Sequence, residues 1–320
     1  MSAARDPVDD ATLALLLEVA GTPKPGNVDR RRDLDDLRFE SFLGGAVGAR
    51  EGLELAATDE ASVGDAFERG VAGMADRAGT NTQFGCLLLL VPLLRATVDD
   101  TDSSPAGRLT PTTVDRVTRD ATVDDAVAFY RAFEHVDVAV ADPPADAADL
   151  DVRRGSDAAS VLRDRGLTLR DVLAISADPD DPDRVPDRNA QEWVEGFPRT
   201  FRAAEWIRAD TGPLTDRAAR AFLGLLAAEP DTLVAASHDP ETARRASARA
   251  AALLGGGDPG SAGPADTDEI HADSVHRADL DAAESLATAF VDEGINPGTT
   301  ADLTSAALYV ALRRGAEVAP

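Results

Sequence analysis

The segment GTPKPGNVDRRR, residues 21–32, contains Lys24, the only lysine of the chain; the other basic side chains, of 32 in all, are arginines. Prolines on both sides of Lys24 restrict the backbone, so its side chain leaves a stiff loop. A compact ammonium in a locally positive segment that includes Arg30 is suited to holding a polyphosphate. The alternative is that residues 30–32 are ordinary surface charges that pair with the acidic residues following them.

A carboxylate follows this loop at Asp36. Leu43 and Val47 lie seven and eleven residues further on, a spacing that predicts one face of a helix and sets Asp36 at the edge of its buried stripe. A carboxylate turned inward needs a cation, a donor or a metal ion. Alternatively, Asp36 only complements the positive end of a helix, together with the neighbouring aspartates.

Two polar turns precede the most apolar helices. The turn at residues 78–85, AGTNTQFG, carries Asn81, Thr82 and Gln83 directly before GCLLLLVPLL. One capping side chain accounts for one of these polar groups, and the others indicate a pocket lining.

The second turn, INPGTTADL at residues 295–303, has the same design, with Asp302 in the first turn of the following helix. Free N–H groups at such a helix start bind phosphate or orient a carboxylate. The alternative for both turns is a capped, buried helix without further function.

The elements that must position these groups are helices. Apolar residues recur with a helical period in most segments, and no clear strand pattern is present. We predict an all-α fold, a single multi-helix domain over residues 1–320 with long polar surface loops. The predicted helices include 37–53, 123–136, 187–208, 215–228, 240–254, 277–293 and 300–314, and the loops lie near 97–111, 141–145, 178–186 and 255–267.

The charge balance is strongly acidic, with 58 acidic against 32 basic side chains and a net charge of −26. Such self-repulsion is tolerable in concentrated salt, where the Debye length falls to about 3 Å. The composition is halophile-like and argues against binding to nucleic acid. No apolar run approaches the roughly 18 residues of a membrane span, and the N-terminus is unlike a signal peptide, so we expect a cytoplasmic protein. Cys86, in an apolar run, is expected to be a buried small side chain.

In combination, these motifs resemble the triphosphoribosyl-dephospho-CoA synthase family, an all-α group. TPKPGNVDR is similar to its Pro-Lys-Pro-Gly-x-Val-Asp signature, DDLRFESFLGGA to its Asp-Met…Phe…Ser helix, and GTNTQFG to its Gly-x-Asn-Thr-His-Lys-Gly loop. DRNAQEWVEGFPRTF and PDTLVAASHDPETA are similar to its middle segments, and NPGTTADLTSAALYVAL to its closing Pro-Gly-Gly-x-Ala-Asp-Leu motif.

The resemblance implies transfer of the triphosphoribosyl part of ATP to the ribose 2′-hydroxyl of dephospho-CoA, with release of adenine. It implies Mg²⁺ and two groups of site residues. The candidates for activating the acceptor hydroxyl are Asp29, Asp36 and Asp302, and the last two are also the candidate metal ligands. The candidates for binding the nucleotide are Lys24, Asn27, Arg30, Asn81, Thr82, Gln83, Asn296, Thr299 and Thr300.

The sequence departs from the family pattern at two places. Leu34 stands where the family has a histidine two residues before the aspartate, and Gln83-Phe84 stands where its loop has His-Lys. These changes remove polar groups from the presumed nucleotide site and leave the acceptor open. Two alternatives therefore stay in view: a ribosyl transferase or ribosyl-bond hydrolase that uses another donor, and a non-catalytic nucleotide-binding helical protein.

Overall fold

The chain forms one helical domain in a computed structural model, which describes residues 5–98, 109–143, 145–178, 183–255 and 270–318. The α-helices of the described residues are α1 (Pro7–Ala20), α2 (Phe39–Gly48), α3 (Arg50–Ala56), α4 (Val63–Ala78), α5 (Phe84–Val98), α6 (Pro111–Arg119), α7 (Val123–Ala132), α8 (Ala159–Arg165), α9 (Leu169–Ala177), α10 (Arg188–Glu195), α11 (Pro198–Ala209), α12 (Leu214–Ala228), α13 (Thr232–Ser237), α14 (Pro240–Leu254), α15 (Ala272–His276), α16 (Leu280–Asp292) and α17 (Gly298–Arg313). Two 3-10 segments, η1 (Ala145–Leu150) and η2 (Val152–Ala158), lie between α7 and α8. The described part contains no β-strand, which confirms the predicted all-α class.

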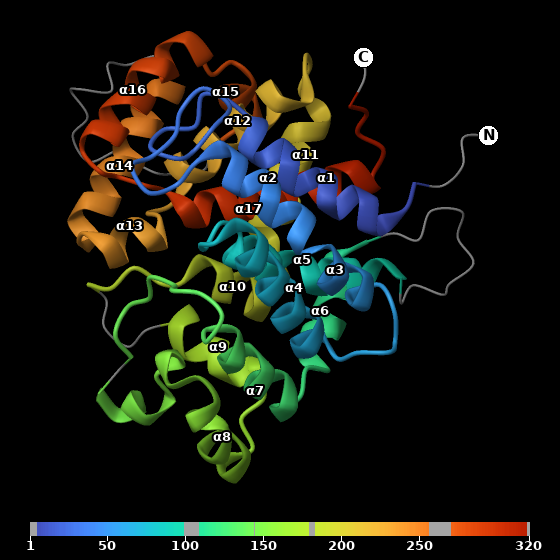
Figure 1. Cartoon of the computed structure of the whole chain (residues 1–320). Coiled ribbons are helices and arrows are strands. Elements are labelled where there is room, and N and C mark those ends of the chain that lie inside the picture. The colour runs from blue at the N-terminus through green and yellow to red at the C-terminus, as the bar shows by residue number, and fades with distance from the viewer. Residues whose placement is uncertain (1–4, 99–108, 144, 179–182, 256–269, 319–320) are drawn as a thin grey trace.

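Helix α17 runs through the middle of the molecule, with α13, α14 and α16 gathered at one end and α7, α8 and α9 at the other (Figure 1). It packs against α1, α5, α11 and α12. Nearly every residue from Thr299 to Leu312 is buried, because the helix is apolar on almost all sides. Asp302 is the exception in that range, since it is half-buried near the start of the helix.

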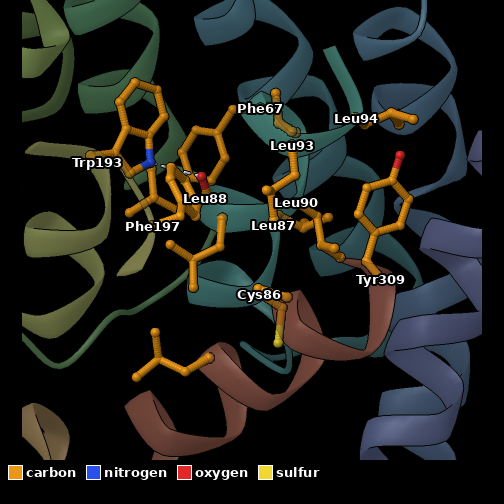
Figure 2. Packing of buried hydrophobic residues seen from close by; sticks show 14 of the residues in the cluster. Phe67, Cys86, Leu87, Leu88, Leu90, Leu93, Leu94, Trp193, Phe197 and Tyr309 are labelled. Carbon is orange, nitrogen blue, oxygen red and sulfur yellow. Dashed lines mark hydrogen bonds between the residues drawn. The ribbon is translucent and has the colours of Figure 1, made fainter. Parts of the chain in front are cut away.

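Helix α5 is the second central element, and most of its side chains are buried. Figure 2 shows Trp193 beside Leu88, where the indole Nε1 donates a hydrogen bond of 2.9 Å to the Leu88 carbonyl oxygen. The same view shows Cys86 next to the helix that carries Tyr309. These contacts fix α5 between α10 and α17.

Glycines allow α2 and α4 to pack closely. A Cβ atom added at Gly48 would overlap the backbone of Gly73, so a larger residue would push the two helices apart. This contact fixes α2 against α4, which leads directly into the 78–85 turn.

Two of the predicted helices are each divided into two, and those predicted at 123–136 and 277–293 are shorter, as α7 and α16. The 187–208 segment forms α10 and α11, because Gly196 and Phe197 adopt positive φ angles of 82° and 65° immediately before Pro198. The 37–53 segment forms α2 and α3, and α2 begins only at Phe39. Most residues of the expected long loops, 99–108, 144, 179–182 and 256–269, lie outside the described residues.

No helix in the described part of the chain is long and apolar enough to cross a membrane.

Candidate active site

The loop after α1 turns Lys24 into the interior. Its side chain is 1% exposed and forms an ion pair with Glu18 on the last turn of α1. The Lys24 ammonium also donates a 3.1 Å hydrogen bond to Asn27 Oδ1. Burial raises the pKa of Glu18, and the neighbouring Lys24 opposes that rise. In this structure the lysine joins the loop to α1 rather than extending toward solvent.

Asp29 organises the same loop. Its carboxylate is fully buried and accepts hydrogen bonds from the Thr22 hydroxyl (2.9 Å), the Arg31 backbone N–H (2.7 Å) and the Arg32 guanidinium (3.0 Å). The Lys24 backbone N–H donates a fourth, at 3.2 Å. Because donors from its own loop surround both oxygens, Asp29 is suited to shaping the loop, and its predicted catalytic role stays a prediction.

The basic residues that follow lie at the surface. Arg30 is exposed, whereas Arg31 and Arg32 both form ion pairs with Glu284 of α16. These two arginines therefore fasten the loop to the end of the molecule that contains α16, and their partner is Glu284 and not the acidic residues that follow them in the chain.

The prediction that Asp36 faces the interior was wrong. The residue precedes α2 in a bend and is exposed, because the helix starts three residues later than its apolar spacing indicated. Leu34 instead packs against a small apolar cluster formed by Val19, Val28 and Phe42. Among the described residues no hydrogen bond or ion pair joins Asp36 to Asp302, and the pairing of the two at a metal ion stays a prediction.

The 78–85 turn caps α5. Asn81 accepts a 3.1 Å hydrogen bond from the Phe84 backbone N–H, and the Thr82 hydroxyl donates to the Gln83 side chain at 3.3 Å. The Gln83 amide in turn donates to the Phe42 carbonyl oxygen of α2 at 3.1 Å. Asn81 and Thr82 are partly exposed, whereas Gln83 is buried.

Phe84, the residue after Gln83, lies in the hydrophobic core. The ring of Phe84 packs against Phe67 and Phe133, with centroid distances of 5.1 and 4.7 Å. Gln83 and Phe84 thus hold α2, α4, α5 and the end of α7 together.

The first and last motifs meet in space. Asn27 donates a 2.9 Å hydrogen bond to Asn296, and Gly26 lies directly against the backbone of Ile295. A Cβ at Gly26 would overlap the Ile295 carbonyl, and its φ of +74° also favours glycine. Two candidate nucleotide-binding residues, 269 positions apart in the chain, are therefore neighbours.

The hydroxyl residues at the start of α17 have protein partners. The Thr300 backbone N–H and hydroxyl each donate to Asp231 at 2.7 Å, and the Thr299 hydroxyl accepts from the Leu233 backbone N–H at 3.3 Å. Asp231 also accepts from the Val234 backbone N–H at 3.1 Å, so it caps α13 and joins it to α17.

Asp302 lies where several motifs converge. Asn189 of α10 donates a 2.9 Å hydrogen bond to one carboxylate oxygen, and the Cys86 thiol of α5 donates to the other at 3.2 Å. A Cβ atom added at Gly85 would overlap the Asp302 carboxylate, so the last residue of the 78–85 turn must be small. The Asn189 side-chain oxygen is buried and has no hydrogen-bond partner among the described residues.

The surroundings of Asp302 raise the pKa of its carboxyl group toward neutral pH. Burial raises the pKa of its carboxyl group to about 7, although the hydrogen bonds from Asn189 and Cys86 favour the anion. The negative charges of Glu18 and Asp231 raise it further. A carboxyl group with a pKa near the working pH can accept and return a proton efficiently.

Three residues of this site were not predicted from the sequence: Glu18, Cys86 and Asn189. Glu18 lies on a helix and gives no local signal, and Cys86 was read only as an apolar side chain. Asn189 falls within the DRNAQEWVEGFP segment that carries the resemblance, and that segment was the one signal that could have found it.

The described residues alone do not form a metal cage. No group of three or more His, Cys, Asp or Glu side chains in the described ranges is placed to hold a metal ion. Mg²⁺ is commonly held by one or two carboxylates together with substrate phosphates. The described residues therefore do not fit a magnesium site built of protein ligands only.

Comparison with known proteins agrees with the motifs. The family model described as CitG, ATP:dephospho-CoA triphosphoribosyl transferase, matches residues 4–319. A solved structure from Archaeoglobus fulgidus, whose assignment as a triphosphoribosyl-dephospho-CoA synthase is itself provisional, superposes with a TM-score of 0.60 at 20% identity. That match covers 86% of this chain and 99% of the other, and it supports the fold. The curated proteins contain no match to this chain.

Proposed function

The chain belongs to the ATP:dephospho-CoA triphosphoribosyl transferase family, and on that premise we propose that Asp302 is the base of a triphosphoribosyl transfer from ATP to the ribose 2′-hydroxyl of dephospho-CoA. The observation that carries this proposal is the convergence on Asp302. Gly85 from the GTNTQFG turn and Asn189 from the DRNAQEW segment both contact its carboxylate. The first motif joins the closing one through Asn27 and Asn296.

The proposed step is a displacement at the anomeric carbon of the ATP ribose. The Asp302 carboxylate accepts the proton of the acceptor hydroxyl, whose oxygen forms the new bond to that carbon. The bond from the carbon to adenine breaks, and adenine leaves with the electron pair and takes up a proton. Such a displacement passes through an oxocarbenium-like state, which neighbouring carboxylates stabilise.

Asn189 is proposed to position Asp302 and the acceptor. Its amide N–H₂ holds one carboxylate oxygen at 2.9 Å, and its own unpartnered oxygen can accept a hydrogen bond from a substrate hydroxyl. Binding that hydroxyl would satisfy a buried polar group that otherwise costs roughly 1–3 kcal/mol. Asn27 and Asn296 are proposed to contact the nucleotide, while Lys24 acts on the loop through Glu18.

Magnesium is proposed as part of the substrate, MgATP. Asp302 is proposed as the base and not as a ligand of the ion, and Asp36 would reach the ion only if the exposed bend ahead of α2 moved. When bound, the ion neutralises charge on the phosphates. The acidic composition supports the further proposal that the enzyme works in the cytoplasm of a cell with concentrated salt.

The test is to incubate the protein with MgATP in concentrated KCl, with and without dephospho-CoA, and to measure adenine by chromatography and the product by mass. We expect adenine only when the acceptor is present, in equal amount to triphosphoribosyl-dephospho-CoA. Adenine formed without acceptor would indicate a ribosyl-bond hydrolase. Saturable ATP binding without adenine, over a broad panel of acceptors, would indicate a non-catalytic nucleotide-binding protein and overturn the proposal.

A further inference from the structure

A small pocket lies between α10, α11, α12 and the start of α17, close in sequence to Asn189 and Asp302. Its lining residues are Arg188, Arg199, Arg202, Leu225, Glu229, Pro230, Asp231, Thr299, Thr300 and Leu303. Three arginines therefore face one pocket in a chain whose net charge is −26.

Protein contacts hold two of these arginines in place before any ligand binds. Arg188 and Arg199 both pair with the carboxylate of Glu229, at 3.0 and 2.9 Å. Each also donates a 2.8 Å hydrogen bond to the Gln191 side-chain oxygen, and each side chain is only 12% exposed. Although burial opposes it, the two arginines lower the pKa of Glu229, so this carboxylate is an anion between two cations.

The third arginine is available to a ligand. Arg202 is exposed, and its guanidinium lies over the Trp206 ring at 5.3 Å from the centroid. Within the described ranges it forms no ion pair with a carboxylate at 4.0 Å or less. The second acid of the lining, Asp231, already accepts hydrogen bonds from Thr300 and Val234.

The pocket adjoins the proposed reaction site through two elements. Arg188 and Asn189 are consecutive at the start of α10, and one faces the pocket while the other holds Asp302. On α17, Thr300 lines the pocket two residues before Asp302. The pocket and the Asp302 site therefore share the start of α10 and the start of α17.

We propose that this pocket binds an oligophosphate chain, with Arg202 as the first contact and Glu229 as the internal anion that the phosphate replaces on Arg188 and Arg199. Planar guanidinium groups bind phosphate oxygens in pairs, which suits this arrangement. The proposal rests on the proposed function for its assignment to a substrate. The chain is either the triphosphate of ATP or the diphosphate of dephospho-CoA, and these two sources share the same chemistry.

The direct test is calorimetric binding of inorganic tripolyphosphate, which needs no turnover. It is done at the lowest KCl concentration that keeps the native circular dichroism spectrum, because salt screens these contacts. We expect Arg202→Gln to weaken binding roughly 10-fold, as loss of one charge-assisted contact implies. The matched control is Arg208→Gln on the same helix, whose side chain is exposed and pairs with Glu205 at 2.9 Å; it should change binding less than about 2-fold.

Glu229→Gln is expected to change the affinity for tripolyphosphate in the opposite direction. It removes the anion that Arg188 and Arg199 share but keeps a hydrogen-bond acceptor there, and Arg199 retains its 2.8 Å ion pair with Glu195. We expect tripolyphosphate to bind several-fold more tightly, whereas a purely structural role for Glu229 predicts equal or weaker binding. Arg199→Lys is less informative, because Arg199 also contacts the buried Glu192 at 3.4 Å and its loss can destabilise α11.

Competition assigns the source of the phosphate. If ATP displaces tripolyphosphate and dephospho-CoA does not, the pocket holds the triphosphate; the reverse result assigns it to the acceptor, and both results support an oligophosphate site. Equal affinity of the wild type, Arg202→Gln and Arg188→Gln, with their melting temperatures unchanged, would overturn the proposal even if adenine is released. Binding that responds to these variants in a protein that releases no adenine would instead overturn only the proposed function.

Discussion

At the residue scale, the ionisation of Asp302 governs the proposed chemistry. Its pKa is raised to about 7, and the proposed base must be deprotonated before the hydroxyl attacks. We predict that kcat/KM for adenine release rises about 10-fold per pH unit below pH 7 and levels off above it. The measurement is the rate of adenine release between pH 5.5 and 8.5. A rate that falls as the pH rises through 7 would contradict this role.

The buried pair of Lys24 and Glu18 leads to a second prediction at this scale. Lys24→Met leaves the carboxylate of Glu18 uncompensated in the interior, and breaking a buried pair in this way costs about 3–5 kcal/mol. We therefore expect a large loss in the free energy of unfolding, measured by urea denaturation. The double variant with Glu18→Gln should recover much of that loss. If Lys24→Met keeps its stability and loses only ATP affinity, the lysine binds phosphate directly, as the sequence first indicated.

At the scale of elements, the contact between the first and last motifs requires Gly26. Its φ of +74° is matched by the φ of +73° at Gly79, but a Cβ at Gly26 would overlap Ile295 whereas one at Gly79 would meet no atom within 4 Å. Gly79→Ala should therefore show the backbone cost alone, about 1 kcal/mol. Gly26→Ala should cost at least about 2 kcal/mol more and should lower activity, because it separates Asn27 from Asn296.

These variants are compared by thermal unfolding and by adenine release. Equal melting temperatures for Gly26→Ala and Gly79→Ala would show that the contact between Gly26 and Ile295 does not contribute to stability.

The helices were predictable where one local pattern decided them. The helices predicted near 240–254 and 300–314 appear as α14 and α17 with almost the same ends, because their apolar spacing and their flanking Pro and Gly residues agree. The break between α10 and α11 was missed, since a positive φ at the buried Phe197 depends on packing that the sequence does not show.

At the scale of the whole molecule, the site is assembled by contacts between distant segments, and this is why the sequence could name some of its parts but not their arrangement. Asp302 was identified from its motif, whereas its partners Asn189 and Cys86 lie 113 and 216 residues away. The arginine pocket was not predicted from the sequence, because only folding brings Arg188 and Arg199 together with residues of α12 and α17.

The net charge of −26 gives the whole-molecule prediction. Self-repulsion among exposed carboxylates weakens as salt shortens the screening length from about 10 Å at 0.1 M to about 3 Å at 1 M. We predict that the melting temperature rises by at least several degrees between 0.1 and 2 M KCl. Calorimetry or circular dichroism measures this rise. A melting temperature that is constant or falls over that range would show that charge repulsion does not limit stability.

The most direct test of the central claim compares the wild type with Asp302→Asn in saturating MgATP and dephospho-CoA. The change keeps the size of the side chain but removes the base, so we predict that ATP still binds, by equilibrium dialysis, while adenine release falls at least about 100-fold. Asp164→Asn, a matched change at an exposed aspartate of α8, should leave the rate within about 2-fold. Adenine release by Asp302→Asn at the wild-type rate would contradict the account.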